Sequence, residues 1–191
     1  LAPLLGINPA CLLLLPVHVV LLELVIDPTC SIVLERQPAE TDVMERPPRK
    51  MNEKLIDINS LTKSLFQGFA IFGAAFGTYL TFLEQYPDNA ALARTMGLTI
   101  MFISNMLLVH VNSSESELAI RSILRLRGDK VIAAVNIGVI LGLIIMLYTP
   151  FADVLKLAPL TWQEIILAVG IACASVLWYE IVKLVRLGMT K

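Results

Sequence analysis

Charged residues are scarce in this sequence. Asp, Glu, Lys and Arg make up only 16% of its 191 residues, whereas 57% are hydrophobic and the mean hydropathy is +0.75. A soluble domain of this size cannot bury so large an apolar fraction. The charges are also nearly balanced, with 15 Lys and Arg against 16 Asp and Glu, so neither a basic nucleic-acid-binding surface nor a long acidic tail is indicated. The composition therefore predicts a membrane protein without a nucleic-acid partner.

Cysteine is rare and carries no metal-binding pattern. Cys11, Cys30 and Cys173 all lie in apolar sequence, without CxxC spacing and without a neighbouring His or Cys cluster. Packed thiols are therefore expected rather than a disulfide or a thiolate-bound metal. A Cys-Pro-Cys motif is also absent, which argues against the transport of copper or zinc.

The usual features of a protein start are missing as well. The sequence opens at Leu1 inside an apolar run, with no initiator Met, no basic segment before it and no small-residue cleavage site. We therefore expect it to be a piece of a longer polypeptide.

Four nearly charge-free stretches have the length that a helix needs to cross a bilayer core of ~30 Å. They cover residues 64–83, 95–114, 131–152 and 165–179, the last continuing past Glu180 to Val182. A fifth apolar region, residues 1–34, is interrupted by five breakers: Pro3, Gly6, Pro9, Pro16 and Pro28.

We therefore predict an all-α fold, a polytopic membrane helix bundle with five complete spans plus the end of a sixth helix. Residues 1–13 are expected to form the end of a preceding span and a turn. Residues 14–34 are expected to form a broken span, residues 35–63 a polar loop, and residues 64–191 a four-helix membrane bundle with short loops.

The basic residues between the spans are distributed unevenly. Six lie in 35–63, one in 84–94, four in 115–130, one in 150–164 and three in 183–191. By the positive-inside rule, the loop 35–63 and the C-terminus are predicted to be cytoplasmic. Tyr79, Phe82, Tyr148 and Trp162 then fall at the opposite membrane face, as an aromatic belt would.

Two glycine pairs, Gly73 with Gly77 and Gly138 with Gly142, have the GxxxG spacing that permits close helix contact. We expect them to serve general packing within one bundle rather than a dedicated dimer interface.

Two carboxylates, Glu23 and Asp27, stand inside an otherwise apolar span. A charge at the bilayer centre costs about 2.5 to 3.5 kcal/mol on the insertion scale, so each is a candidate functional residue. Their spacing of four places both on one helical face, where like charges repel unless a cation or a proton lies between them. The alternatives are that both are protonated and hydrogen-bonded, or that Glu23 pairs with a basic residue outside the sequence.

Pro28 strengthens the hypothesis of a cation site. It removes a backbone donor and clashes with the carbonyl of Leu24, which frees an oxygen ligand beside the carboxylates. A broken span next to acidic side chains is a recurring way to bind a hard cation near the bilayer midplane. Asn105, in the middle of another span, is a weaker candidate whose amide oxygen either joins this site or forms an interhelical hydrogen bond.

Other intramembrane polar residues are expected to have structural roles. His18 and His110 fall near span ends and are predicted to be interfacial, Gln67 and Asn136 to be packed polar residues, and Glu180 to pair with Lys183.

Three motifs together resemble the C-terminal membrane region of type-II P-type cation-transporting ATPases. They are the Pro-Val-His segment at 16–18, the Glu-Leu-Val-Ile-Asp stretch at 23–27, and Asp-Val-Met-Glu-Arg-Pro-Pro-Arg at 42–49. The resemblance extends over essentially the whole sequence, since four further spans complete the usual ten. It is most specific in residues 16–50.

The resemblance implies roles for individual residues. Asp27 matches the central cation-ligating aspartate of the family, and Asn105 falls where the eighth span of relatives contributes a Glu or Gln ligand. Glu23 occupies a position that is Asn in calcium pumps of the reticulum type and is more like the sodium/potassium and proton/potassium pumps. Ile26 replaces a ligating Thr.

The resemblance further implies alternating access driven by phosphorylation of an aspartate elsewhere in a full-length pump. ATP and Mg²⁺ are then needed only by that full-length protein, and no ATPase activity is expected of this chain alone. Its partners would be the lipid bilayer and the N-terminal domains of the same pump. Ca²⁺ is the first expectation for the transported cation, with a monovalent cation or a proton as alternatives because of Glu23.

A second hypothesis is a stand-alone, non-enzymatic membrane protein or a transporter subunit derived from a pump. The reading frame upstream of Leu1 discriminates between the two.

Overall fold

The structure, a computed structural model, describes residues 12–36, 58–112 and 129–189. These residues form helices α1 (Pro16–Glu35), α2 (Ile58–Gln85), α3 (Ala90–Asn112), α5 (Lys130–Tyr148), α6 (Phe151–Val154) and α7 (Trp162–Met189). Five of them are long and apolar enough to cross a membrane, which confirms the predicted all-α class and the five spans. The predicted end of a sixth helix before Leu12, most of the loop 35–63 and the motif at 42–49 lie outside the described residues.

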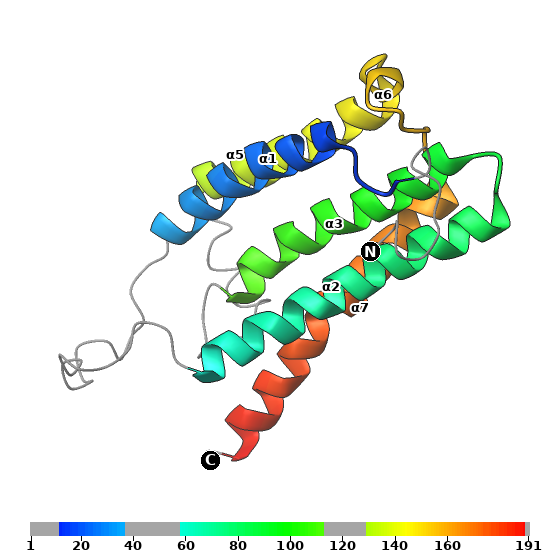
Figure 1. The fold of residues 1–191 in the computed structure, drawn as a ribbon. Helices are drawn as coiled ribbons and strands as arrows, with labels where there is room; N and C mark the ends of the chain where they lie inside the picture. Colours follow the sequence, from blue (N-terminus) through cyan, green and yellow to red (C-terminus); the bar gives the residue numbers. More distant parts are fainter. Residues whose placement is uncertain (1–11, 37–57, 113–128, 190–191) are drawn as a thin grey trace.

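Helix α3 is the centre of the bundle. It contacts α1 and α5 on one side and α2 and α7 on the other (Figure 1). Its buried side chains include Met96, Leu98 and Ile100, which join residues of α2 and α7 in the main hydrophobic cluster. We call the end of the bundle at which α2 turns into α3, and α5 reaches α7 through α6, the hairpin end.

Local signals explain where the helices begin at the hairpin end. Asn89 starts α3, because its side-chain oxygen accepts a hydrogen bond from the backbone N–H of Leu92 at 3.2 Å. In the first turn of α7, the Glu164 carboxylate accepts hydrogen bonds from the backbone N–H and the hydroxyl of Thr161, the residue before the helix, at 2.6 and 2.8 Å. Both caps pair groups that a helix end would otherwise leave without partners.

Several helix bounds differ from the predicted spans. Helix α2 begins at Ile58 rather than at residue 64, because the helix continues past Lys63 beyond the apolar run. Helix α5 ends at Tyr148 rather than at residue 152, since Pro150 has no N–H to continue it, and the chain forms the separate helix α6. Charge-free length therefore locates a span but not its ends.

Helix α1 is continuous, whereas the sequence predicted a broken span. It runs without interruption from Pro16 to Glu35 with Pro28 inside it. Pro28 cannot donate to the carbonyl of Leu24, but the following residue, Thr29, adds a side-chain hydrogen bond to the carbonyl of Val25 at 2.6 Å. The proline thus removes one bond of the helical ladder without ending the helix.

The glycine contacts also differ from expectation. A Cβ added at Gly73, Gly77, Gly138 or Gly142 would meet no atom within 4 Å, so these GxxxG pairs do not mediate close packing among the described residues. The close approach is at Gly97 of α3, where an added Cβ would lie 3.2 Å from the Ala75 carbonyl oxygen of α2. Spacing alone identifies small residues but does not show which of them faces a neighbouring helix.

The predicted aromatic belt does not hold for two of its four residues. Tyr79 is fully buried and Phe82 nearly so, because both pack into the core between α2 and α3. Tyr148 and Trp162 are exposed, as an interfacial position requires.

Buried polar side chains tie the hairpin end together. Arg94, only 3% exposed, donates from Nε to the Leu12 carbonyl at 2.8 Å and from Nη1 to the Lys156 carbonyl at 2.7 Å. The fully buried His18 lies 2.8 Å from the Leu155 carbonyl through Nε2. The segment before α1 is thereby joined to the connection between α6 and α7.

Further polar pairs join the helices toward the opposite end. Gln67 of α2 and Asn112 of α3 exchange two amide hydrogen bonds, at 3.2 and 3.3 Å. His110, in the last turn of α3, is buried and contacts the Asn136 amide oxygen at 3.2 Å. The predicted pair of Lys183 and Glu180 is present at 3.1 Å.

One ion pair connects the end of α1 to the start of α5. Arg36 Nε donates to Asp129 Oδ2 at 2.8 Å, and the other oxygen of Asp129 accepts from the backbone N–H of Val131 at 2.8 Å, which caps α5. These hydrogen bonds hold the pKa of Asp129 below its usual value of 3.8, and the bond from Arg36 has the largest effect.

The lowered pKa of Asp129 predicts a pH effect on stability. The pKa of Asp129 is lower in the folded state than in the unfolded state. The ion pair therefore stabilises the fold fully at pH values above the usual pKa, and this stabilisation is lost as pH falls through the folded-state pKa. In thermal unfolding of the full-length protein between about pH 5 and about pH 3, wild type should lose more stability than Asp129→Asn. All other acids are shared, so equal pH slopes in the two proteins would contradict the prediction.

Candidate cation site

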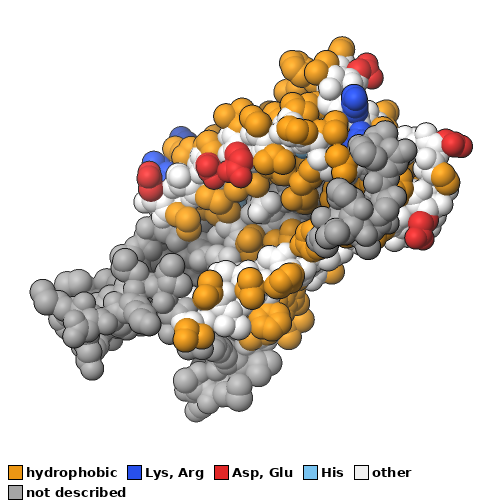
Figure 2. All heavy atoms as spheres, viewed as in Figure 1, with side chains coloured by type: hydrophobic (Ala, Val, Ile, Leu, Met, Phe, Trp, Pro, Cys, Tyr) orange, Lys and Arg blue, Asp and Glu red, His pale blue; other side chains and the backbone are white. Residues whose placement is uncertain are grey.

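Glu23 and Asp27 lie in the middle of α1, on the side that faces away from the rest of the described bundle. The face of α1 that packs inward is formed by His18, Leu22, Thr29 and Val33. At 100° per residue, Asp27 projects nearly opposite this face and Glu23 close to Asp27. Both carboxylates are exposed in the structure. Figure 2 shows acidic side chains on α1 surrounded by hydrophobic ones.

The pair offers oxygen ligands of the kind that a hard cation binds. Residues four apart on a helix have Cβ atoms about 5–6 Å apart, so two carboxylates at this spacing can share one cation. Pro28 has no N–H to donate to the carbonyl of Leu24, so that carbonyl oxygen is a further candidate ligand beside the pair. Carboxylate and carbonyl oxygens are the ligands that hard cations prefer.

Asn105 is not brought together with the carboxylates. It is half-buried on α3, and its Nδ2 donates to the Met101 carbonyl of the same helix at 2.9 Å. It lines a small cavity against Ile26 and Cys30 of α1, and neither Glu23 nor Asp27 lines that cavity. The Oδ1 of Asn105 can still coordinate a cation, but the described residues place it beside the flank of α1 rather than its outer face.

The described residues supply only part of a coordination shell. Within residues 12–36, 58–112 and 129–189, no group of three or more His, Cys, Asp or Glu side chains converges. Ca²⁺ takes six to eight oxygen ligands, which is more than Glu23, Asp27 and one carbonyl provide. The exposed face of α1 therefore needs ligands from elsewhere to complete a cation site.

Comparison with known proteins identifies the family of this chain. The family described as "Cation transporting ATPase, C-terminus" matches residues 11–185. Over 159 residues the chain is 26% identical to a calcium-transporting ATPase of Bacillus subtilis (strain 168), an alignment that covers 83% of this chain. The chain spans 18% of the length of that relative. With its five membrane-spanning helices, the chain belongs to the cation-transporting ATPase family as a C-terminal, multi-pass membrane region.

Proposed function

We propose that this chain forms part of the cation pathway of an ATP-driven pump and that Glu23 and Asp27 are cation ligands. The supporting observation is the position of the two carboxylates, in the middle of a membrane-spanning helix and on the face of α1 that the described bundle does not cover. An intramembrane carboxylate without a structural partner is costly, and a bound cation offsets that cost. Asn105 was predicted as an auxiliary ligand, but its place beside the flank of α1 separates it from the two carboxylates, so the proposal rests on Glu23 and Asp27.

The proposed cation is Ca²⁺. Two carboxylates with amide and carbonyl oxygens form a hard, oxygen-only donor set. The similar Bacillus protein is named a calcium-transporting ATPase, which supports the same choice. Glu23 favours a monovalent cation or a proton as the alternative, because a second carboxylate can hold a proton between two like charges.

In this proposal, transport uses alternating access. The carboxylates bind the cation at the bilayer midplane, and phosphorylation of an aspartate in another part of the full-length protein moves the spans that complete the site. ATP and Mg²⁺ act there and not in this chain. The N-terminal domains of the same pump are then the partners of the exposed face of α1, and the loop 35–63 and the C-terminus are cytoplasmic.

The proposal is tested by phosphorylation of the full-length protein with labelled ATP across a panel of cations. We expect Ca²⁺ to stimulate phosphoenzyme formation, whereas Zn²⁺ and Cu⁺ should not. Stimulation by a monovalent cation or by protons would support the assignment as a pump but would show that Ca²⁺ is not the transported ion. If the full-length protein forms no cation-dependent phosphoenzyme, the pump proposal is rejected and a non-enzymatic membrane protein is favoured.

A further inference from the structure

The fully buried His18 has a defined hydrogen-bond partner at each ring nitrogen. Nδ1 accepts from the backbone N–H of Leu15, the N-cap of α1, at 3.2 Å, and Nε2 lies 2.8 Å from the carbonyl oxygen of Leu155. A backbone N–H can only donate, so Nδ1 carries no proton, and Nε2 must hold the proton that it donates to Leu155. The surroundings of His18 therefore fit the neutral imidazole with its proton on Nε2.

A second proton would disrupt this arrangement. The imidazolium has two donor nitrogens, so the backbone N–H of Leu15 would lose its acceptor and the new Nδ1–H would point at another donor. Both groups would then be buried without a partner, which is unfavourable. The bond to Leu155 alone would survive.

The charges around His18 also favour the neutral form. The guanidinium of Arg94, from α3, acts electrostatically on the imidazole and would repel a second positive charge. Asp153 and Lys156, on either side of Leu155, are both exposed, so solvent screens their charges. On α1 the nearest carboxylate is Glu23, which is exposed on the outer face, and α5 has no charged residue between 131 and 148. Among the described residues, no carboxylate bonds to His18.

His18 and Arg94 connect the same two parts of the hairpin end. Arg94 bonds to the carbonyls of Leu12, just before α1, and Lys156, just after α6. His18 does the same through Leu15 and Leu155. Arginine keeps its charge at any physiological pH, whereas histidine changes charge near neutrality. One connection is therefore permanent and the other is sensitive to protons.

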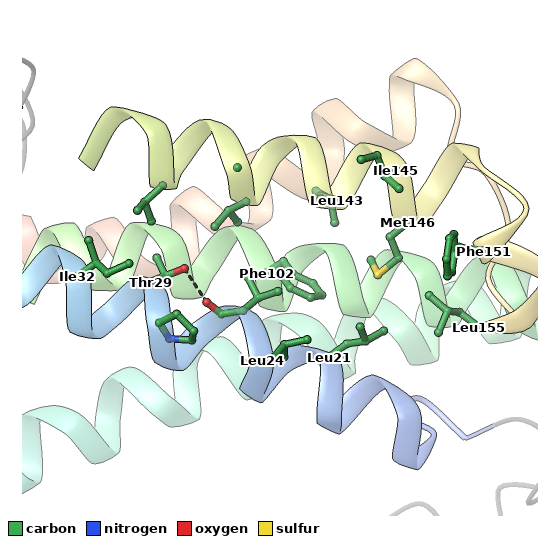
Figure 3. A pocket seen from close by; sticks show the side chains of 16 residues that line it. Leu21, Leu24, Thr29, Ile32, Phe102, Leu143, Ile145, Met146, Phe151 and Leu155 are labelled. Atoms are coloured by element: carbon green, nitrogen blue, oxygen red, sulfur yellow. Dashed lines mark hydrogen bonds between the residues drawn. The ribbon is translucent and has the colours of Figure 1, made fainter. Parts of the chain in front are cut away.

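Leu155 links this contact to the next turn of α1. Its side chain points into an apolar groove between α1 and α5, which Leu21 and Leu24 of α1 and Met146 of α5 also line (Figure 3). The carbonyl of Leu155 thus bonds to His18 while its side chain lies beside the turn of α1 that carries Glu23. A loss of the His18 contact is therefore expected to affect how this turn is placed.

We propose that neutral His18 is a latch that holds the start of α1 against the end of α6, and that protonation of His18 from the hairpin side of the membrane releases it. His18 lies in the first turn of α1, at the hairpin end, where a proton from that side arrives first. The consequence for transport rests on the proposed function, because α1 carries Glu23 and Asp27. Release of its start would then make the position of both carboxylates depend on pH.

The experiment measures hydrogen exchange of the full-length protein in nanodiscs by mass spectrometry, without ATP or added cation. Exchange of residues 12–20 is expressed as a protection factor, the ratio of the intrinsic rate to the measured rate at each pH. Between about pH 8 and about pH 4.5, which brackets the ordinary histidine pKa of about 6.5, the wild-type protection factor should fall at least about fivefold on acidification. A constant wild-type protection factor would overturn the latch and leave the pump proposal untouched, because the readout needs neither cation nor phosphorylation.

His18→Gln is the matched control. At this position of a helix, a Gln side chain can accept from the N–H of Leu15 and donate to the carbonyl of Leu155, but it does not titrate. Its protection factor should equal that of neutral wild type and stay constant with pH. His110, the other histidine of the chain, is present in both proteins. A parallel fall in wild type and His18→Gln would therefore assign the pH effect to another group and overturn the proposal.

His18→Phe tests the hydrogen bonds without the charge. Phe fills the space of the imidazole and bonds to neither backbone group, so its protection factor should be low at every pH, as in acidified wild type. Protection equal to that of neutral wild type would mean that packing alone holds α1, which would also contradict the latch. The wild-type pH profile decides the question if either variant does not fold.

Discussion

Replacing Asp27 by Asn in the full-length protein is expected to lower its apparent affinity for the transported cation by more than about a hundredfold. The substitution keeps the size of the side chain and removes one full negative charge from the middle of α1. Changes outside the first ligand shell of a metal site already cost about 10–100-fold, so loss of a charged ligand must cost more. Cation-stimulated phosphoenzyme formation, titrated with the cation, measures the affinity.

The matched control for Asp27 is Glu35→Gln on the same helix. Glu35 is also an exposed carboxylate, but it is the last residue of α1, at the end of the membrane span. Its neutralisation should leave the cation titration unchanged, because it lies about 12 Å along the helix axis from Asp27. A wild-type titration in Asp27→Asn would exclude Asp27 as a ligand, and equal losses in both variants would indicate a general effect of surface charge.

Replacing Arg94 by Met is expected to destabilise the folded protein by about 3 kcal/mol. Arg94 is buried and donates to two backbone carbonyls, those of Leu12 and Lys156. Hydrogen bonds from a charged group contribute about 1.5–3 kcal/mol each, and the substitution leaves two carbonyl oxygens without these donors. Met fills a similar volume, so the loss measures the hydrogen bonds rather than a cavity. Equilibrium unfolding of the full-length protein in detergent is the measurement.

Arg36→Met is the control for this prediction. Arg36 is also an arginine, but it forms an ion pair with Asp129 in which 47% of its side chain is exposed, and exposed pairs contribute about 1 kcal/mol or less. The expected order is therefore a large loss for Arg94→Met and a small one for Arg36→Met. Similar losses in the two variants would mean that the buried position of Arg94 has no special importance at the hairpin end.

Arg94 also shows why a hydropathy pattern misses some residues of a membrane core. The apolar run begins at Thr95, so the predicted span excluded the arginine before it. In the structure α3 begins at Ala90 and buries Arg94. The carbonyls that make this burial possible come from residues 82 and 62 positions away in the chain. No local pattern in the sequence contains that information.

The candidate site was predicted only in part. The proximity of Glu23 and Asp27 follows from their spacing, because residues four apart share a face in any helix. The continuous path of α1 through Pro28 and the separation of Asn105 from the carboxylates did not follow from it. Whether a proline breaks a helix, and which flank of a helix a distant side chain reaches, depends on neighbouring helices that local spacing does not specify.

The sequence by itself determined that this protein is a five-span membrane bundle with two carboxylates inside its first complete span. Hydropathy and charge are sums over neighbouring residues, so the printed sequence contains them completely. Only the tertiary structure decided that the carboxylates face away from the described bundle while an apolar groove opens between α1 and α5. The rotation of each helix about its own axis is set by packing against the others, and that packing joins residues far apart in the chain.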